Sequence, residues 1–200
     1  MRFRLSAFVV TTRLTGLTRL TVITVLAVAA APATAQTRVP ASGMWSLGGS
    51  IGKATPADPS LDNGLDLAGN LEGYLTPRVS VRGQLEGAWF DIVGRHFVGT
   101  VNPVSLSGNL SYNWEGGVWH PYITGGVGMY RQHSSESGAA NSVDTRGGIN
   151  VGGGVEYFFT RRATITGEAL YHRVESVHTP LTTFNQGSYW SFRAGLKTYF

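Results

Sequence analysis

The sequence predicts an all-β fold, in which eight antiparallel strands close into an up-and-down barrel that spans a membrane, after a cleaved signal peptide. Three observations lead to this prediction. Segments of about ten residues alternate large apolar with small or polar side chains, a length that crosses a bilayer at a tilt. The connections between them alternate between short turns and longer loops. The charged side chains of these segments all fall on one face.

The first 35 residues have the features of an export signal. Four arginines and no acid precede the apolar run 20–31, which is too short to span a bilayer. Ala33-Thr34-Ala35 is a small-x-small cleavage site. We therefore expect residues 1–35 to be a signal peptide and residues 36–200 to be the membrane-spanning β-barrel domain. A retained N-terminal anchor is the alternative, and the absence of Cys excludes a lipoprotein.

Composition limits the other possible functions. The chain has 200 residues, enough for one domain with a substantial core. Its formal net charge is +4, but the four arginines of the signal peptide account for all of it, so the mature chain is neutral and gives no support for nucleic-acid binding. Without Cys the protein has neither disulfides nor thiolate metal sites.

The first four predicted strands have apolar residues at every second position. In residues 44–52, tryptophan, leucine and isoleucine alternate with small residues. Residues 65–75 repeat the pattern with leucine, residues 79–90 with valine, leucine and tryptophan, and residues 104–113 with valine, leucine and tyrosine. A period of two is the signature of a strand with unlike faces.

The last four strands follow the same rule. Residues 121–131 form the fifth, although glycines occupy both of its faces. Residues 148–159 and 163–173 place aromatic and aliphatic residues opposite polar ones, and residues 189–200 end the chain. The tight turns are centred on Pro77, Gly116 and Arg161. The predicted loops are residues 53–64, 91–103, 132–147 and 174–187.

Eight charged side chains lie opposite the large apolar residues of the strands. They are Asp66, Glu72, Arg82, Glu86, Glu156, Glu168, Arg193 and Lys197. A charge that faces lipid near the midplane costs roughly 2–4 kcal/mol, so this charged face is predicted to line the interior. The five acids and three bases should pair there in two layers, because an unpaired buried charge is costly.

The turn at Pro77 places Glu72 opposite Arg82, and Glu156 should lie at the height of Lys197. Glu86, Glu168 and Arg193 are expected to form the second layer, with Glu168 and Arg193 on adjacent strands. The excess acid should be protonated, solvated near a mouth like Asp66, or bonded to Tyr and Ser hydroxyls. Such an interior predicts a packed ionic core that does not conduct.

The aromatic residues of the apolar face gather at the strand ends and predict two belts. Trp89, Tyr171 and Trp190 lie at the loop ends of their strands. Trp45, Tyr112, Tyr157, Phe159 and Phe200 lie at the turn ends. Amphipathic rings prefer the two membrane–water interfaces.

The last strand resembles the final strand of bacterial outer-membrane β-barrels, which their assembly machinery recognises. Its apolar alternation includes Phe192 and Leu196 and ends on Phe200, although Thr198 departs from the pattern. Taken with the export signal and the strand pattern, residues 44–200 resemble the eight-stranded OmpA/OmpX-type barrels. The resemblance implies the outer membrane of a Gram-negative-type bacterium, and contact with its lipids and with the barrel-assembly machinery. We expect a monomer with no cofactor, no nucleic-acid partner and no peptidoglycan-binding domain after Phe200. Nothing in the loops identifies their partner.

Other interpretations fit less well. A soluble eight-stranded barrel such as a lipocalin would not explain the long strands, the terminal aromatic residue or the two belts. His96, His120, His133, His172 and His178 are scattered without metal-ligand spacing, and we expect them at the solvated surface.

A lipid-A-modifying barrel enzyme needs a Ser and a His together on the lipid face. Here His172 faces inward, and His133-Ser134 falls in a predicted polar loop. We therefore expect no enzymatic activity. A structural or surface-interaction role is favoured, and a small porin or transporter is the alternative, because side chains can fill an eight-stranded barrel.

Overall fold

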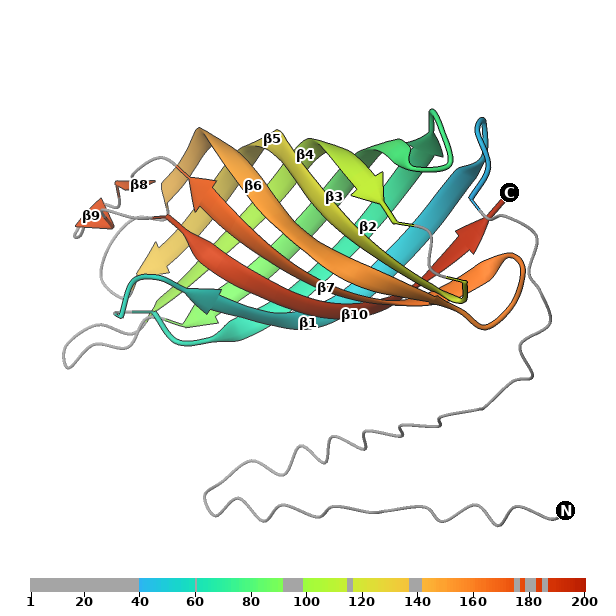
Figure 1. Cartoon of the computed structure of the whole chain (residues 1–200). Helices are drawn as coiled ribbons and strands as arrows, with labels where there is room; N and C mark the ends of the chain where they lie inside the picture. Colours follow the sequence, from blue (N-terminus) through green and yellow to red (C-terminus); the bar gives the residue numbers. More distant parts are fainter. Residues whose placement is uncertain are drawn as a thin grey trace, which may run out of the picture. The chain divides into compact units, whose positions relative to one another are not determined.

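The computed structural model describes residues 40–59, 61–91, 99–114, 117–136, 142–174, 177–178, 183–184 and 187–200. Eight antiparallel strands close into a barrel in the order β1-β10-β7-β6-β5-β4-β3-β2 (Figure 1), as predicted. Their bounds are β1 Trp45–Pro56, β2 Gly64–Tyr74, β3 Val79–Asp91, β4 Gly99–Asn113, β5 Trp119–Glu136, β6 Ser142–Phe158, β7 Ala163–Val174 and β10 Tyr189–Tyr199. The two-residue strands β8 (Val177–His178) and β9 (Thr183–Phe184) pair with each other outside the barrel sheet.

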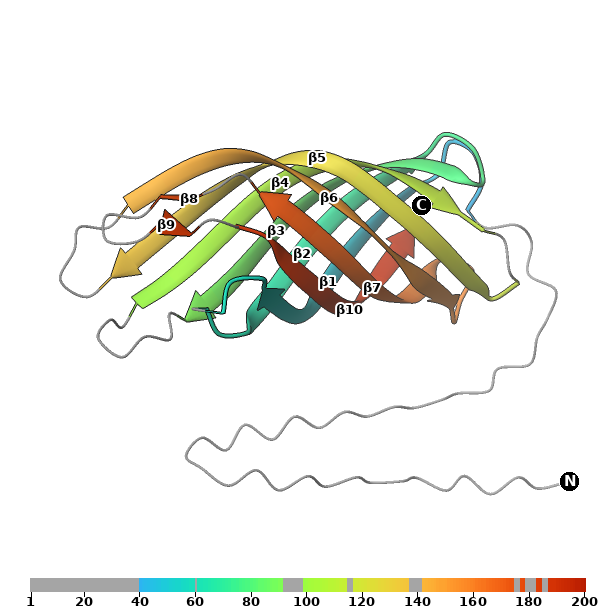
Figure 2. The ribbon, with the colours of Figure 1, turned by 60° about the vertical axis from the view of Figure 1, so that its left-hand side comes forward.

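The strand register defines how far the strands tilt. Starting at Trp45 and stepping to the paired residue of each neighbouring strand, the path returns to β1 at Thr55, ten residues further along. A displacement of ten residues over eight strands corresponds to a tilt of about 40°, and each residue then adds about 2.5 Å of height. The tilt is visible in Figures 1 and 2. We call the end that holds Phe200 the turn end, and the opposite end the loop end.

Several strands run further toward the loop end than the apolar pattern predicts. β1 continues to Pro56, and β4 begins at Gly99. The predicted loop 132–147 is wrong for most of its length, because β5 continues to Glu136 and β6 begins at Ser142. Backbone pairs such as Gln132↔Asp144 extend this hairpin through polar residues. Alternation of apolar side chains reports the membrane-facing part of a strand, whereas backbone pairing needs no apolar face.

The barrel has its polar side chains inside and its apolar side chains outside. All eight predicted interior charges point inward, and seven of them are no more than 5% exposed. The side chain of the eighth, Glu168, is 9% exposed. Outward residues such as Leu106, Val127 and Leu196 are more than 60% exposed. A soluble barrel has the reverse arrangement, so the faces fit a barrel surrounded by lipid.

A ring of small residues crosses the outer face at half height. Every barrel strand contributes at least one outward Gly or Ala that lies about 9–14 Å above Trp45 along the barrel axis, as calculated from the tilt. They are Gly49, Gly69, Gly83, Gly108, Gly125, Gly153, Gly167, Ala169 and Ala194. A side chain at Gly49, Gly108 or Gly167 would meet no atom within 4 Å. Packing within the chain therefore does not require glycine at these three positions.

Inward glycines have a different cause, because they make room for large side chains of the interior. A methyl group at Gly154 would lie 2.7 Å from the Tyr122 hydroxyl and 2.3 Å from the carbonyl oxygen of Gly167. At Gly148 it would lie 2.7 Å from the Tyr130 ring. These glycines of β6 let two tyrosines of β5 lie across the neighbouring strand.

Candidate functional site: the barrel interior

The lowest charged layer of the interior lies next to the turn end. β2 and β3 place Glu72 opposite Arg82 in register, and Arg82 Nη2 lies 3.3 Å from Glu72 Oε2. Lys197 of β10 donates to the same carboxylate oxygen at 2.7 Å. The Ser80 hydroxyl donates to the other oxygen of Glu72. Glu72 thus has two cations and a hydroxyl as partners and no exposed surface.

Glu156 of β6 completes this layer. One of its carboxylate oxygens accepts a hydrogen bond from Lys197 Nζ, and the other accepts one from the Tyr199 hydroxyl. Lys197 therefore bridges two carboxylates, Glu72 and Glu156. A lysine this deeply buried needs such compensation, because removing an ammonium from water costs several kcal/mol.

The middle of the barrel is bridged by Glu168 of β7. One of its oxygens accepts Arg82 Nη1 at 2.5 Å and the Tyr122 hydroxyl at 2.7 Å. The other accepts Arg193 Nη2 at 2.6 Å. Arg193 and Glu168 are register partners on adjacent strands, whereas Arg82 comes from the opposite wall. The two layers expected from the sequence are thus one connected network.

The upper layer is centred on Glu86 of β3. Arg193 Nη1 donates to one oxygen at 2.8 Å, together with the amide of Gln84 at 2.9 Å. The other oxygen accepts the hydroxyls of Tyr189 and Ser191 at 3.0 and 3.1 Å. Arg193 therefore holds two glutamates from different strands through separate nitrogens, a geometry that the rigid guanidinium fork allows.

Apolar and aromatic clusters lie on both sides of the network. At the turn end, Tyr74, Phe158 and Tyr199 are buried together, with Phe158 5.3 Å from Tyr199 between ring centroids. At the loop end a second cluster contains Ala54, Ala88, Phe90, Tyr130, Val174 and Tyr189. The charged network is therefore enclosed at both ends.

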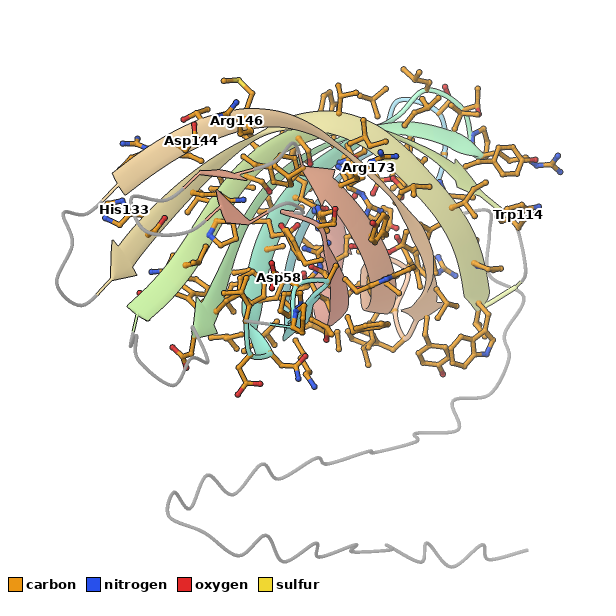
Figure 3. The ribbon with its side chains drawn as sticks, turned by 90° about the vertical axis from the view of Figure 1, so that its left-hand side faces the viewer. Asp58, Trp114, His133, Asp144, Arg146 and Arg173 are labelled. Atoms are coloured by element: carbon orange, nitrogen blue, oxygen red, sulfur yellow. The ribbon has the colours of Figure 1, made fainter. Side chains whose placement is uncertain are left out.

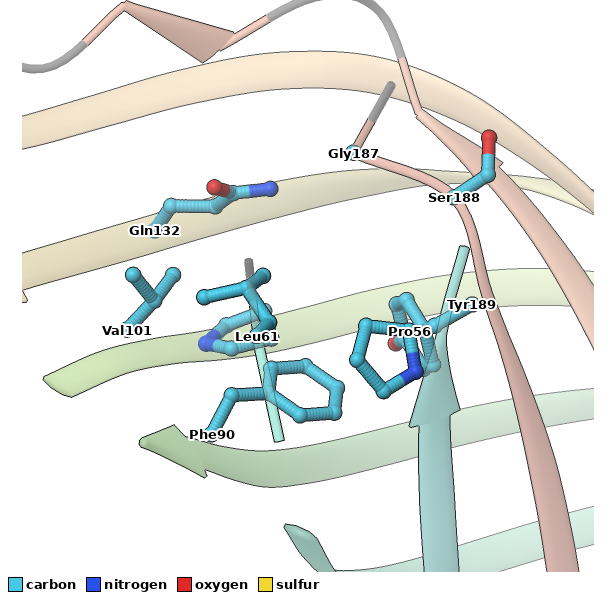
Figure 4. A pocket seen from close by; sticks show the side chains of 9 residues that line it. Pro56, Leu61, Phe90, Val101, Gln132, Gly187, Ser188 and Tyr189 are labelled. Atoms are coloured by element: carbon cyan, nitrogen blue, oxygen red, sulfur yellow. The ribbon is translucent and has the colours of Figure 1, made fainter. Parts of the chain in front are cut away.

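A small cavity lies at the loop-end mouth, above the second cluster (Figure 4). Its volume is about 20 Å³, and Leu61, Phe90, Val101 and Tyr189 are among its lining residues. A volume of this size holds about one water molecule. This cavity is therefore too small for a solute the size of a sugar or an amino acid.

Asp66 and two histidines differ from the expectations. Asp66 has no exposed surface, so it is not solvated at a mouth, and its nearest cation is Arg193 Nη1 at 3.7 Å. His172 is 1% exposed, stacks on Tyr189 at 4.5 Å between centroids and lies 3.3 Å from Glu86 Oε1. His120 is 7% exposed and packs on Phe158. The prediction that these histidines are solvated is therefore wrong. His96 lies outside the described residues.

Sequence reasoning also missed the tyrosines that satisfy the carboxylates. Tyr122, Tyr189 and Tyr199 all donate to interior glutamates. Their inward parity was visible in the sequence, and an excess of acids inside indicated that hydroxyl donors were needed. Parity alone does not show which tyrosine reaches which carboxylate across the lumen.

His133 and Ser134 lie in β5 and not in a loop, which corrects the earlier placement. His133 is exposed on the outer face, whereas Ser134 is buried. Neighbouring residues of a strand point to opposite faces of the sheet, so His133 and Ser134 do not share the lipid face. Among the described residues no group of three or more His, Cys, Asp or Glu is arranged to hold a metal ion.

The outer face places the predicted belt residues at two heights. Trp45, Tyr112, Tyr157 and Phe159 lie at the turn end, and Trp119 packs on Tyr157 at 4.6 Å between centroids. Trp190 and Tyr171 are register partners and lie about 20 Å higher, with Trp89 slightly above them. The apolar band between the belts is thus close to the roughly 25 Å of known membrane barrels.

Phe192, Leu196 and Phe200 point outward and are 50%, 62% and 64% exposed. The backbone of Phe200 pairs with Trp45 through two hydrogen bonds, N–H to O at 2.9 Å and O to N–H at 3.0 Å. Phe200 therefore extends the closing seam between the last and the first strand. Within the described part of the chain, no helix is long and apolar enough to cross a membrane.

Comparison with known proteins gives a family and several similar folds. The sequence family of the outer membrane protein beta-barrel domain matches residues 21–200 of the chain. No curated protein is significantly similar to the chain. OprG from Pseudomonas aeruginosa is 13% identical with a TM-score of 0.62, over 80% of this chain and 97% of OprG.

Neisserial surface protein A is 16% identical with a TM-score of 0.59, over 80% of this chain and 98% of that one. Ail, the attachment invasion locus protein of Yersinia pestis, is 11% identical with a TM-score of 0.53, over 80% and 99% of the two chains. The chain therefore belongs to the outer membrane protein β-barrel family, and its barrel has the same fold as OprG, Neisserial surface protein A and Ail.

Proposed function

We propose that the protein is a structural, surface-displaying barrel of the outer membrane whose interior does not conduct. The observation that carries this proposal is the salt bridge between Arg82 and Glu168, which joins opposite walls of the lumen at 2.5 Å. A solute on the barrel axis would have to separate these two charges. The other charged partners of the two residues already form ion pairs elsewhere: Glu72, beside Arg82, pairs with Lys197, and Arg193, beside Glu168, pairs with Glu86.

The enclosing clusters support the same proposal. Ion pairs are screened and exchanged readily in water, and much less so where water is kept out. Tyr74, Phe158 and Tyr199 cover the network on one side, and Phe90, Tyr130 and Tyr189 cover it on the other. Opening a path would expose these side chains as well as break the network. The interior is therefore suited to holding the barrel rigid.

The loop end is the part suited to interaction. The β5–β6 hairpin continues about 10 Å beyond the upper aromatic belt through the register pairs Gln132↔Asp144 and His133↔Val143. Gln132 is buried, whereas His133, Asp144 and Arg146 keep exposed surface on this extension. Asp144 and Arg146 of β6 form an ion pair at 2.9 Å on this extension (Figure 3). A polar hairpin on a rigid barrel presents a fixed surface outside the membrane.

A role in catalysis is not part of the proposal. Acyl hydrolysis at the lipid face needs a base and a nucleophile in contact. His172, which has a buried carboxylate beside it, faces the lumen, and His133 has Asn102 and Val143 as its register partners. These placements support a non-enzymatic barrel.

The test is single-channel recording of the refolded protein in a planar bilayer. We expect no steady open level, and we expect short openings to become frequent in Arg82→Ser/Glu168→Ser, which removes the bridge across the lumen and retains the barrel backbone. Arg161→Ser, in an exposed turn, is the control variant and should behave as the wild type. A steady open conductance in the wild type would establish the small porin or transporter instead.

A further inference from the structure

The outward-facing charges of the described barrel strands are few and lie near one end. They are Lys53, Asp91, Arg131 and Arg173. All four lie about 20–30 Å above Trp45, as calculated from the strand tilt, and below them the described strands carry no charged side chain on their outer faces. Cations thus outnumber acids by three to one at the upper aromatic belt.

Two of these cations flank the last strand. Lys53 is a register partner of Phe192 on β10, and Arg173 lies two residues beyond Tyr171 on β7, the other neighbour of β10. Arg173 is exposed at the loop end of β7 (Figure 3). Neither Lys53 nor Arg173 forms an ion pair with a described residue, and β1, β7 and β10 place no acid on their outer faces.

An aromatic surface lies between the two cations. Trp190 of β10 packs against Tyr171 at 5.2 Å and against Phe192 at 6.0 Å between ring centroids. The three rings form a continuous strip that descends from the upper interface toward the middle of the membrane. Trp190 is 44% exposed and Phe192 is 50% exposed, so the strip is open to the bilayer.

We propose that Lys53, Arg173 and this aromatic strip form a binding site for a phosphate-bearing lipid headgroup in the leaflet at the loop end. The cations supply the charge that a lipid phosphate requires at the membrane surface. The rings of Trp190 and Tyr171 occupy the headgroup level, where amphipathic aromatic residues are favoured. The Phe192 ring offers an apolar surface to the first part of an acyl chain.

The site is one-sided. The outer faces of β2, β3 and β4 carry no described cation, and the one charge there is Asp91 at the end of β3. Arg131 on β5 extends the basic side to five adjacent strands of the barrel order. A phosphorylated lipid should therefore bind around β10 and be absent from the β2–β4 side.

The experiment is a titration of the folded barrel in neutral detergent micelles with diphosphorylated lipid A, followed by native mass spectrometry of the bound lipid. Lys53→Gln/Arg173→Gln should weaken binding about tenfold, because each cation near a membrane surface contributes appreciably to anion attraction. Arg161→Gln/Arg162→Gln makes the same change of charge in the turn at the opposite end, and should bind as the wild type. Heat-modifiable migration confirms that all variants are folded.

Dephosphorylated lipid A tests whether the phosphates are the recognised group, and it should bind about as weakly as a diacylglycerol, which carries no phosphate. The proposal is overturned if Lys53→Gln/Arg173→Gln retains wild-type binding, if the control pair loses binding equally, or if removing the phosphates has no effect. Competition by millimolar inorganic phosphate would assign the site to a free anion and would also overturn the lipid site.

Discussion

Arg82 and Glu168 join strands that lie opposite each other in the barrel order, β3 and β7, through a contact of 2.5 Å. Neither residue can make this contact along the sheet, because four strand positions separate them. The contact connects the pair Glu72–Arg82 to the pair Glu168–Arg193, so that four residues from four strands form one chain of charges. Side chains from opposite walls therefore meet inside the lumen.

The first prediction concerns the stability of this chain of charges. Arg82→Ala should lower the free energy of unfolding by about 3–5 kcal/mol, because it leaves Glu72 and Glu168 buried with fewer cations. Arg161→Ala, in an exposed turn, should change it by less than about 0.5 kcal/mol. Urea unfolding of the refolded barrel in lipid vesicles measures both values.

A double-mutant cycle makes the first prediction specific to the pair. Arg82→Met/Glu168→Gln should cost clearly less than the two single changes added together, since removing both partners leaves no isolated charge between them. Additive losses would show that Arg82 and Glu168 are not energetically coupled, whatever their distance.

The sequence alone predicted which side chains face the lumen, and in most cases which charged residues lie at the same height in the barrel. The period of two assigned Glu72, Glu168 and Arg193 to the lumen, and the turn at Pro77 gave the pairing of Glu72 with Arg82. The bridge from Arg82 to Glu168 could not be predicted from these patterns. Contacts across the lumen depend on the ten-residue displacement of the strand register, which no local sequence pattern contains. The burial of His172 was missed for the same reason, since its partners Tyr189, Glu86 and Tyr130 come from three other strands.

The second prediction uses the two classes of glycine. Gly108→Ala should raise the free energy of unfolding by roughly 0.5–1 kcal/mol, because it restricts the unfolded chain and meets no atom within 4 Å in the barrel. Gly154→Ala should lower it by about 1–3 kcal/mol, because its methyl group would press on the Gly167 carbonyl and the Tyr122 hydroxyl. Vesicle-based unfolding compares the two variants directly. Equal effects would mean that the inward and outward positions do not differ as described.

The third prediction is that export removes residues 1–35. The arginines at the start, the apolar run 20–31 and Ala33-Thr34-Ala35 motivate it. N-terminal sequencing of protein from the outer membrane should read from Gln36. Replacing Ala33 and Ala35 with leucine should leave the longer precursor in the inner membrane. Mature protein that still begins with Met1 would refute the prediction.

The last prediction separates assembly from stability at Phe200. Its side chain is 64% exposed on the outer face, while its backbone makes both hydrogen bonds to Trp45 at the closing seam. Phe200→Ser keeps those bonds, so the variant refolded in vitro should lose less than about 1.5 kcal/mol, the transfer term of one partly exposed ring. In cells, the same variant should reach the outer membrane several-fold less, because the resemblance assigns this ring to recognition by the assembly machinery.

Leu47→Ser is the matched control for Phe200→Ser. Leu47 is 54% exposed on the outer face of the strand that pairs with the last one, so it loses a similar lipid contact without touching the terminal residue. Deleting Phe200 removes the two seam bonds as well and should lower stability in vitro more than Phe200→Ser does. Fractionation of cells, with heat-modifiable migration as the mark of a folded barrel, compares all three variants. If Leu47→Ser and Phe200→Ser reach the outer membrane in equal amounts, Phe200 acts only as another lipid-facing residue.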